Sequence, residues 1–373
     1  MKAPAFWDRP QSTGQTGWHN RVPHDTELLA TGWGAWPGED PRKGASVAFS
    51  ELAAGYPPVP YPSTLEVGGT RWACDLLGFA VTLCDGLPVD LTSYGWRLAK
   101  GTGRDESRAR SRRARAIEAA EEYGAGFDGR MMLTVPGPWT LVRNLSTPDG
   151  NRVLGDSGAR RDVIQSYAFG LADYMSALAR ALGQAPRIMV VERALDPILT
   201  GTVPTVSGYR SLPALPDQFV TAALGSFLKR AGDDPLLALP ALGSVTIAGK
   251  RIPHLQLARE AGASGVVVPL PGTDPRRWEN LAEAVDTGAE VWLSLPGSAG
   301  EQPDQVKRWV ATIREPWLRT GMSSVSLAKL GIVAGYGFPT DIPPLLPQEA
   351  TDTNARGGYA LAARLSEALK EIE

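Results

Sequence analysis

From residue 27 onward, short apolar runs alternate with longer stretches in which apolar residues recur at helical spacing. The runs are bounded by Gly or Pro, which is typical of buried strands separated by turns. They lie at residues 27–34, 86–93, 130–137, 187–194, 235–242, 265–270, 290–297 and 323–330. Eight such runs with helix-like intervals predict a closed (β/α)8 barrel of parallel strands rather than an open sheet.

The intervals between the runs carry helix signals. The stretch 157–183 begins with Ser157 and ends with Gly183, residue types that are favoured at the two ends of a helix. The stretches 274–288, 302–318 and 353–373 have the same helical spacing. Residues 1–27 show no period, and we expect an irregular amino-terminal segment there. The sequence therefore predicts one barrel over residues 28–373, with the proline-rich stretch 55–69 as a loop.

Charge and hydropathy exclude two classes of partner. The chain has 38 Lys and Arg against 40 Asp and Glu, so it has no basic excess for nucleic acid. The one dense basic stretch, 103–124, has its arginines at helical spacing and indicates a solvated helix face. No run approaches the roughly 18–20 apolar residues that span a bilayer, and the amino terminus has no signal-peptide pattern. We expect a cytoplasmic protein that binds neither nucleic acid nor membrane.

The two cysteines, Cys74 and Cys84, are separated by an apolar, helix-like stretch. Two cysteines in a chain of this length do not form a disulfide framework. We interpret both as small buried residues rather than reactive ones.

Four tryptophans follow predicted strands at the end where a parallel barrel places its ligand site. Trp33 and Trp36 come after the first run, Trp96 after the second and Trp139 after the third. Together these indoles could wall one pocket, and we predict that Trp33, Trp36 and Trp139 converge there. For any single indole, packing beneath the loops is the favoured alternative.

Five segments resemble the cobalamin-independent methionine synthases. They are ATGWGAWPGEDP at 30–41, PVDLTSYGWRL at 88–98, VPGPWTL at 135–141, ERALDPILTGTVPTVSGY at 192–209 and AREAGASGVVVPL at 258–270. Their order and approximate spacing are similar to those of the short, single-barrel relatives of the catalytic domain of that family. The resemblance implies a barrel of the methionine synthase and uroporphyrinogen decarboxylase type. It also implies methyl transfer from a folate to a homocysteine thiol activated by zinc.

The zinc ligands of that family have no counterpart in this chain. Strand order places Leu239, Ala241, Pro269 and Leu330 where the resemblance implies His, Cys, an acidic residue and Cys. None of these side chains binds zinc. His19 and His24 lie in the irregular segment, and His254 opens the helix before the sixth run, where we expect it to face away from the site. We therefore predict no metal and no zinc-dependent methyl transfer.

A second departure concerns the amino-acid substrate. Where the resemblance implies Asp-Glu-Pro at the end of the fourth strand, this chain has Val191, Glu192 and Arg193. Glu192 is the candidate catalytic residue, as an acid, a base or a group that binds a cation. The alternative is a carboxylate held by Arg193 or by backbone amines. Ala35 stands where the family has Ser, at a contact that is partly through the backbone.

The remaining candidates at the predicted mouth are Asp90 after the second run and the pair Ser207 and Tyr209 in the loop after the fourth. Like Glu192, Asp90 could be a catalytic group or a carboxylate held by a neighbouring cation or backbone amine. For Ser207 and Tyr209, a structural role in closing the loop is at least an equal alternative. Lys329 would form a Schiff base only if desolvated, and an ordinary ion pair is favoured.

Three functions remain open. The leading hypothesis is a methionine-synthase-like barrel that has lost zinc chemistry and keeps a pocket for a small molecule, folate-like or amino-acid-like, without a cofactor. The second is an enzyme with altered, metal-free chemistry centred on Glu192. The third is a structural or interaction protein with a vestigial pocket. Fold alone does not choose among them.

Overall fold

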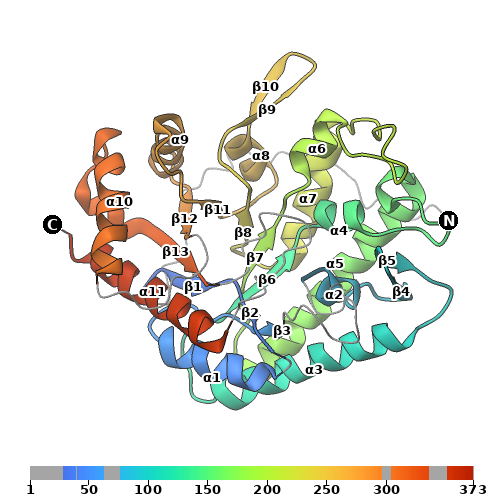
Figure 1. Cartoon of the computed structure of the whole chain (residues 1–373), viewed down its shortest axis with the longest axis horizontal. Helices are drawn as coiled ribbons and strands as arrows, with labels where there is room; N and C mark the ends of the chain where they lie inside the picture. Colours follow the sequence, from blue (N-terminus) through green and yellow to red (C-terminus); the bar gives the residue numbers. More distant parts are fainter. Residues whose placement is uncertain (1–27, 39, 63–75, 296–303, 336–350, 373) are drawn as a thin grey trace.

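The computed structural model describes residues 28–38, 40–62, 76–295, 304–335 and 351–372, so the predicted segment 1–27 lies outside the described residues. Its centre is a seven-stranded parallel sheet in the order β1-β13-β12-β11-β8-β7-β6 (Figure 1). In chain order these strands are β1 (Ala30–Gly32), β6 (Met132–Pro136), β7 (Arg187–Val191), β8 (Leu236–Ala238), β11 (Gly265–Pro269), β12 (Glu290–Ser294) and β13 (Leu330–Ala334). The strands are buried along almost their whole length, as expected where helices cover a parallel sheet.

An extended segment between β1 and β6 nearly closes the ring. Tyr56 donates its N–H to Ala30 O (2.8 Å), and Val59 donates to Met132 O (2.8 Å). Both pairings are parallel bridges rather than full ladders. The prolines at 57, 58 and 60 have no N–H to donate, which explains why this stretch pairs so sparsely. The strands and this segment form a nearly closed parallel barrel, which confirms the predicted fold class.

Two predicted strands were wrong. The run 86–93 contributes β4 (Val89–Thr92), which pairs antiparallel with β5 (Gly95–Leu98) in a separate hairpin. Residues 56–59, at the start of the proline-rich stretch that we predicted as a loop, take the second barrel position instead. The run 323–330 contains a 3-10 helix, η2 (Ser324–Lys329), and β13 begins where that run ends.

Helices surround the barrel (Figure 1). They are α1 (Pro41–Glu51), α2 (Leu76–Val81), α3 (Arg104–Gly124), α4 (Pro138–Asn144), α5 (Ser157–Leu182), α6 (Leu195–Thr200), α7 (Asp217–Ala231), α8 (His254–Glu260), α9 (Pro275–Asp286), α10 (Gln305–Arg319) and α11 (Asp352–Lys370). The N-cap of α5 is Asp156 rather than the predicted Ser157, since its carboxylate accepts from Ala159 N–H. Gly183 ends this helix in the left-handed conformation, as predicted. Within the described residues, no helix is long and apolar enough to cross a bilayer.

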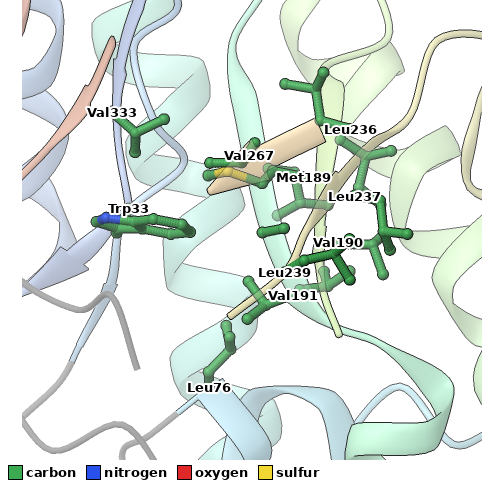
Figure 2. Packing of buried hydrophobic residues seen from close by; sticks show 14 of the residues in the cluster. Trp33, Leu76, Met189, Val190, Val191, Leu236, Leu237, Leu239, Val267 and Val333 are labelled. Carbon is green, nitrogen blue, oxygen red and sulfur yellow. The ribbon is translucent and has the colours of Figure 1, made fainter. Parts of the chain in front are cut away.

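Apolar side chains from the strands fill the middle of the molecule. Figure 2 shows Trp33 and Val333 on one side of this core and Val190, Val191 and Leu239 on the other. All five are nearly inaccessible to solvent. The barrel interior is therefore a packed core, and a ligand site has to lie at its rim.

A salt bridge crosses the core at the amino ends of the strands. Arg187 opens β7 and Glu290 opens β12, and both side chains are buried. The guanidinium donates to Oε1 (2.8 Å) and Oε2 (2.7 Å) of Glu290. The Trp292 indole also donates to Glu290 Oε1 (2.6 Å), and Asp234 lies 3.2 Å from Arg187 Nε. This end of a parallel barrel supplies stability rather than ligand contacts.

A hairpin of β9 (Ser244–Ile247) and β10 (Lys250–Pro253) projects from the rim between β8 and α8 (Figure 1). Its two-residue turn has both residues at positive φ, 47° for Ala248 and 82° for Gly249. We expect Ala248→Asn to raise the free energy of unfolding by up to about 1 kcal/mol, because Asn tolerates this conformation better than Ala. Urea denaturation midpoints measure the change. The matched variant Ala248→Val should be less stable than wild type, and equal midpoints for the two variants would refute the assignment.

Candidate functional site

Glu192 is a buried carboxylate at the carboxyl ends of β6 and β7. It follows β7 directly, and its Oε2 accepts from the backbone N–H of Trp139 (3.0 Å) and of Thr140 (3.3 Å). Its Oε1 accepts from the Thr140 hydroxyl (2.6 Å) and from Ala194 N–H (3.0 Å). Trp139 and Thr140 belong to the first turn of α4, whose N–H groups have no partner within the helix. Glu192 therefore caps this helix from the neighbouring strand.

Gly137, between β6 and α4, permits this close approach, because a Cβ there would clash with the Glu192 carboxylate. Burial raises the pKa of Glu192, while the hydrogen bonds from Thr140, Ala194 and Trp139 act in the opposite direction. A carboxylate has about four acceptor positions, and here four donors use them. The contacts thus match the alternative in which backbone amines hold the carboxylate.

Two half-buried arginines lie on the loop that follows β6. Arg143 is in the last turn of α4, and Arg152 precedes the 3-10 helix η1 (Val153–Gly155). Arg152 donates from Nε to Pro204 O (2.8 Å) and from Nη1 to Arg143 O (3.1 Å), which ties this loop to the one after β7. Burial lowers the pKa of both guanidinium groups. Neither forms an ion pair with an acidic side chain among the residues that the structure describes.

A third half-buried arginine, Arg160, follows in the first turns of α5. Arg160 donates from Nη1 to Leu154 O (2.6 Å) and lies over the ring of Phe219, 5.6 Å from its centroid. Burial lowers its pKa as well. These three arginines belong to no sequence motif and were therefore not predicted. The available signal was their concentration after one barrel strand, in a loop interrupted by a short helix.

The structure gives two of the predicted indoles different packing partners. Trp36 packs on Gly44 of α1, with its ring 6.4 Å from that of Tyr359 in α11. Trp139 instead contacts Phe219 of α7, with ring centroids 5.8 Å apart, and donates to Val220 O (2.9 Å). These two buried rings pack against different helices, so each large indole has its own local packing partners.

Trp33 and Trp96 are also buried. Trp33 lies in the core, as Figure 2 shows. Trp96 is within β5 of the separate hairpin, so it does not follow a barrel strand. The contacts of Trp36 and Trp139 therefore match the alternative in which an indole packs beneath the loops.

Asp90 does not follow a barrel strand either, because it lies in β4 and pairs with Arg97 of β5 (3.0 Å). Ala35 is buried in the short strand β2 (Ala35–Trp36), which pairs with β3 (Tyr61–Pro62). Ser207 and Tyr209 are in the loop after β7, where the Ser207 hydroxyl lies 3.2 Å from that of Thr205 and the Tyr209 ring is almost fully exposed. The structure thus does not bring these residues to Glu192.

His254 begins α8, as predicted, but its ring does not face away from the rim, because it contacts segments that follow β7 and β8. Its Nε2 lies 2.8 Å from Asp196 Oδ1 in α6, and its Nδ1 lies 3.1 Å from Ala241 O. The ring is nearly buried while the carboxylate is half exposed. Lys329 is exposed and precedes β13, so its predicted place near the end of the eighth strand was wrong.

Three of the four positions where the resemblance implies zinc ligands lie at the carboxyl ends of the strands, and the fourth does not. Leu239 and Ala241 follow β8, and Pro269 ends β11, so these three lie at the carboxyl ends. Leu330 opens β13 and lies at the opposite end, because that strand starts later than predicted. The described residues contain no group of three His, Cys, Asp or Glu side chains arranged to hold a metal. The side chains at the carboxyl-end positions do not fit zinc.

Cys84 is buried, and burial raises its pKa to about 12. We expect it to resist thiol reagents in the folded protein, because the thiolate is the reactive form. A Cys74→Ser variant isolates this thiol, because Cys74 and Cys84 are the two cysteines of the sequence. Reaction with a chromogenic disulfide should be absent in buffer and complete in denaturant. Rapid labelling of the folded variant would contradict the burial.

No protein family and no curated protein matches the sequence. Among solved structures, the chain is similar to a B12-independent methionine synthase from Shewanella sp. W3-18-1 at 12% identity and a TM-score of 0.40, covering 68% of this chain and 66% of that one. It is also similar to a Listeria monocytogenes protein proposed to be a vitamin-B12-independent methionine synthase, at 12% identity and a TM-score of 0.47, covering 94% and 99%. A GH113 beta-mannanase from Alicyclobacillus acidocaldarius has 12% identity and a TM-score of 0.39, covering 92% and 98%. These likenesses are too distant to choose a function, and the fold assignment comes from the strand order itself.

Proposed function

We propose that this protein is a methionine-synthase-like barrel that binds a small anionic molecule at the carboxyl ends of β6 and β7. The observation that carries the proposal is the pair Arg143 and Arg152, which are half-buried and form no ion pair with an acidic side chain among the described residues. Removing a guanidinium from water is costly unless an opposite charge compensates. A carboxylate of a folate-like or amino-acid-like ligand supplies that charge and accepts two parallel hydrogen bonds from one arginine.

Glu192 supports this site indirectly. Its carboxylate fixes the start of α4, and Arg143 lies in the last turn of the same helix. The charge of Glu192 also acts on Arg143 and raises its pKa, against the larger effect of burial. Glu192 is therefore proposed as a positioning residue. The competing enzyme hypothesis needs a carboxylate with a free acceptor, which these four hydrogen bonds oppose.

Ligand binding tests the proposal. We expect a folate, homocysteine or methionine to raise the melting temperature, and Arg143→Gln to weaken the Kd by about tenfold or more, since a charged hydrogen bond contributes roughly 1.5–3 kcal/mol. The control Arg314→Gln replaces an exposed arginine of α10 and should leave the Kd unchanged. Equal affinity of wild type and Arg143→Gln would overturn the assignment of this site. Binding by none of these compounds would favour the structural or interaction protein.

The proposed function includes no zinc-dependent methyl transfer. Leu239, Ala241 and Pro269 offer no ligand atoms, and an apolar site cannot compensate for removing water from a divalent ion. Without zinc, a homocysteine thiol stays mostly protonated at neutral pH. We expect dialysed protein to contain no stoichiometric zinc by elemental analysis and to show no methyl transfer to homocysteine. A full equivalent of zinc, or turnover lost on chelation, would refute this part.

A further inference from the structure

A cavity outside the barrel strands is lined by residues of β10, α8 and α9 and of the loop after β8. Its volume is about 410 Å³, within the range of small-molecule sites. Helix α8 and strand β10 form one wall, and α9 forms the other. The polar lining consists of Arg251, Gln256, Arg259, Asn280, Glu283 and Thr287. This cavity shares no residue with the proposed site at β6 and β7.

The wall formed by α8 and β10 is positively charged. Arg251 donates from Nε to Ser244 Oγ (2.6 Å) across the hairpin, which fixes the side chain and leaves its terminal nitrogens available. Arg259, in the last turn of α8, makes no side-chain hydrogen bond or ion pair within the described part of the chain. These two guanidinium groups can bind one carboxylate.

The wall formed by α9 carries acceptors. Asn280 donates from Nδ2 to Leu242 O (2.8 Å), which holds the amide in place and leaves its carbonyl oxygen available. Glu283 is one helical turn further along α9, so its side chain lies on the same face. It forms no ion pair with a described basic residue, Arg259 included, although both line the cavity.

We infer that this cavity is a binding site for a small zwitterion, of the size of an amino acid or a dipeptide. Its carboxylate would bind Arg251 and Arg259, and its ammonium group would bind Glu283 and the Asn280 carbonyl. Leu255 and Pro253 give the apolar surface for a side chain between the two charged ends. This site is independent of the proposed function at the mouth. Because the loop that carries Leu242 begins at β8, an occupant would also contact the rim of the barrel.

The experiment uses dialanine and two blocked forms of it as probes. Saturation-transfer NMR measures the binding of each probe to the full-length protein. N-acetyl-dialanine lacks the ammonium group, and dialanine amide lacks the carboxylate. We expect dialanine to bind in the millimolar range and both blocked forms to bind at least about fivefold more weakly, as expected for the loss of a charged contact. Equal binding of all three probes would overturn the inference.

Variants assign the two ends. Arg259→Gln should weaken the binding of dialanine and leave the binding of dialanine amide unchanged. Glu283→Gln should weaken the binding of dialanine and leave the binding of N-acetyl-dialanine unchanged. The control Arg308→Gln, an exposed arginine of α10, and the mouth variant Arg143→Gln should both bind dialanine like wild type. If Arg143→Gln weakens the binding and Arg259→Gln does not, the zwitterion binds at the mouth and the inference is wrong. No transfer to dialanine at all would also overturn it, without affecting the proposed function.

Discussion

Glu290→Ala is expected to lower the free energy of unfolding by about 3–5 kcal/mol, the largest effect we predict for a single substitution. The variant removes a carboxylate that accepts two hydrogen bonds from Arg187 and one from Trp292. The guanidinium of Arg187 is only 1% exposed and would lose its buried counter-charge, keeping only the partly exposed Asp234. Burial by itself lowers the pKa of Arg187, but the hydrogen bond and charge of Glu290 outweigh it, and the pKa is raised.

Urea denaturation monitored by fluorescence measures this loss as a shift in midpoint. The double variant Arg187→Met, Glu290→Leu separates a lost charge pair from a lost carboxylate. Since it buries no unpaired charge, it should recover much of the stability that Glu290→Ala loses. The control Glu315→Ala removes the partner of Arg319 in an exposed pair on α10 and should change the midpoint little. A Glu290→Ala midpoint equal to that of wild type would contradict the proposed role of the pair.

The apolar pattern predicted the strands that are continuous buried runs. β6, β7, β11 and β12 are each five residues long and nearly inaccessible to solvent, and all four fall within predicted runs. The run 86–93 is also bounded by turn residues, yet its strand β4 pairs with β5 across a tight turn at Ser93 and Tyr94. A run of this kind can pair with its neighbour in a hairpin or with a distant strand in the barrel. Which of the two partners it takes depends on the fold of the whole chain. Periodicity alone does not contain this information.

The second barrel position shows a different limit. The prolines at 57, 58 and 60 remove backbone donors, so the segment has no strand signal. It nevertheless forms two backbone hydrogen bonds with Met132. The N–H of Val59 donates to Met132 O, and the N–H of Met132 donates to Pro57 O (2.9 Å). Only the neighbouring strands β1 and β6 give it an extended path. Its proline content therefore predicted a loop.

The sequence also located Glu192 at a strand end but could not give its partners. Trp139 and Thr140 are about fifty residues earlier in the chain, and they reach Glu192 only because β6 and β7 are neighbours in the barrel. The arginines after β6 were missed for the same reason, since their burial depends on how two loops pack. Residue types indicate which groups can react, whereas the packing decides whether their acceptors are already in use.

Glu192→Gln is expected to lower the free energy of unfolding by about 1–3 kcal/mol, because one acceptor becomes a donor. Whichever oxygen the amide nitrogen replaces, it would face donors that need an acceptor: Trp139 N–H on one side, or Ala194 N–H on the other. The first turn of α4 would lose part of its cap, and Arg143 at the far end of this helix would be held less firmly. Urea midpoints measure the stability loss, and the Kd of an anionic ligand should rise in the same variant.

Thr140 provides the matched pair of variants, because its hydroxyl donates to Glu192 Oε1 and accepts from Arg193 N–H (2.8 Å). Thr140→Val has nearly the same shape without the hydroxyl and should lose stability as Glu192→Gln does. Thr140→Ser keeps the hydroxyl and should lose less. If Glu192 instead acted as an acid or base, Glu192→Gln would abolish a turnover while leaving the midpoint near that of wild type. Stability is the readout that separates these roles, because a carboxylate that caps a helix contributes to the free energy of unfolding whether or not a substrate is present.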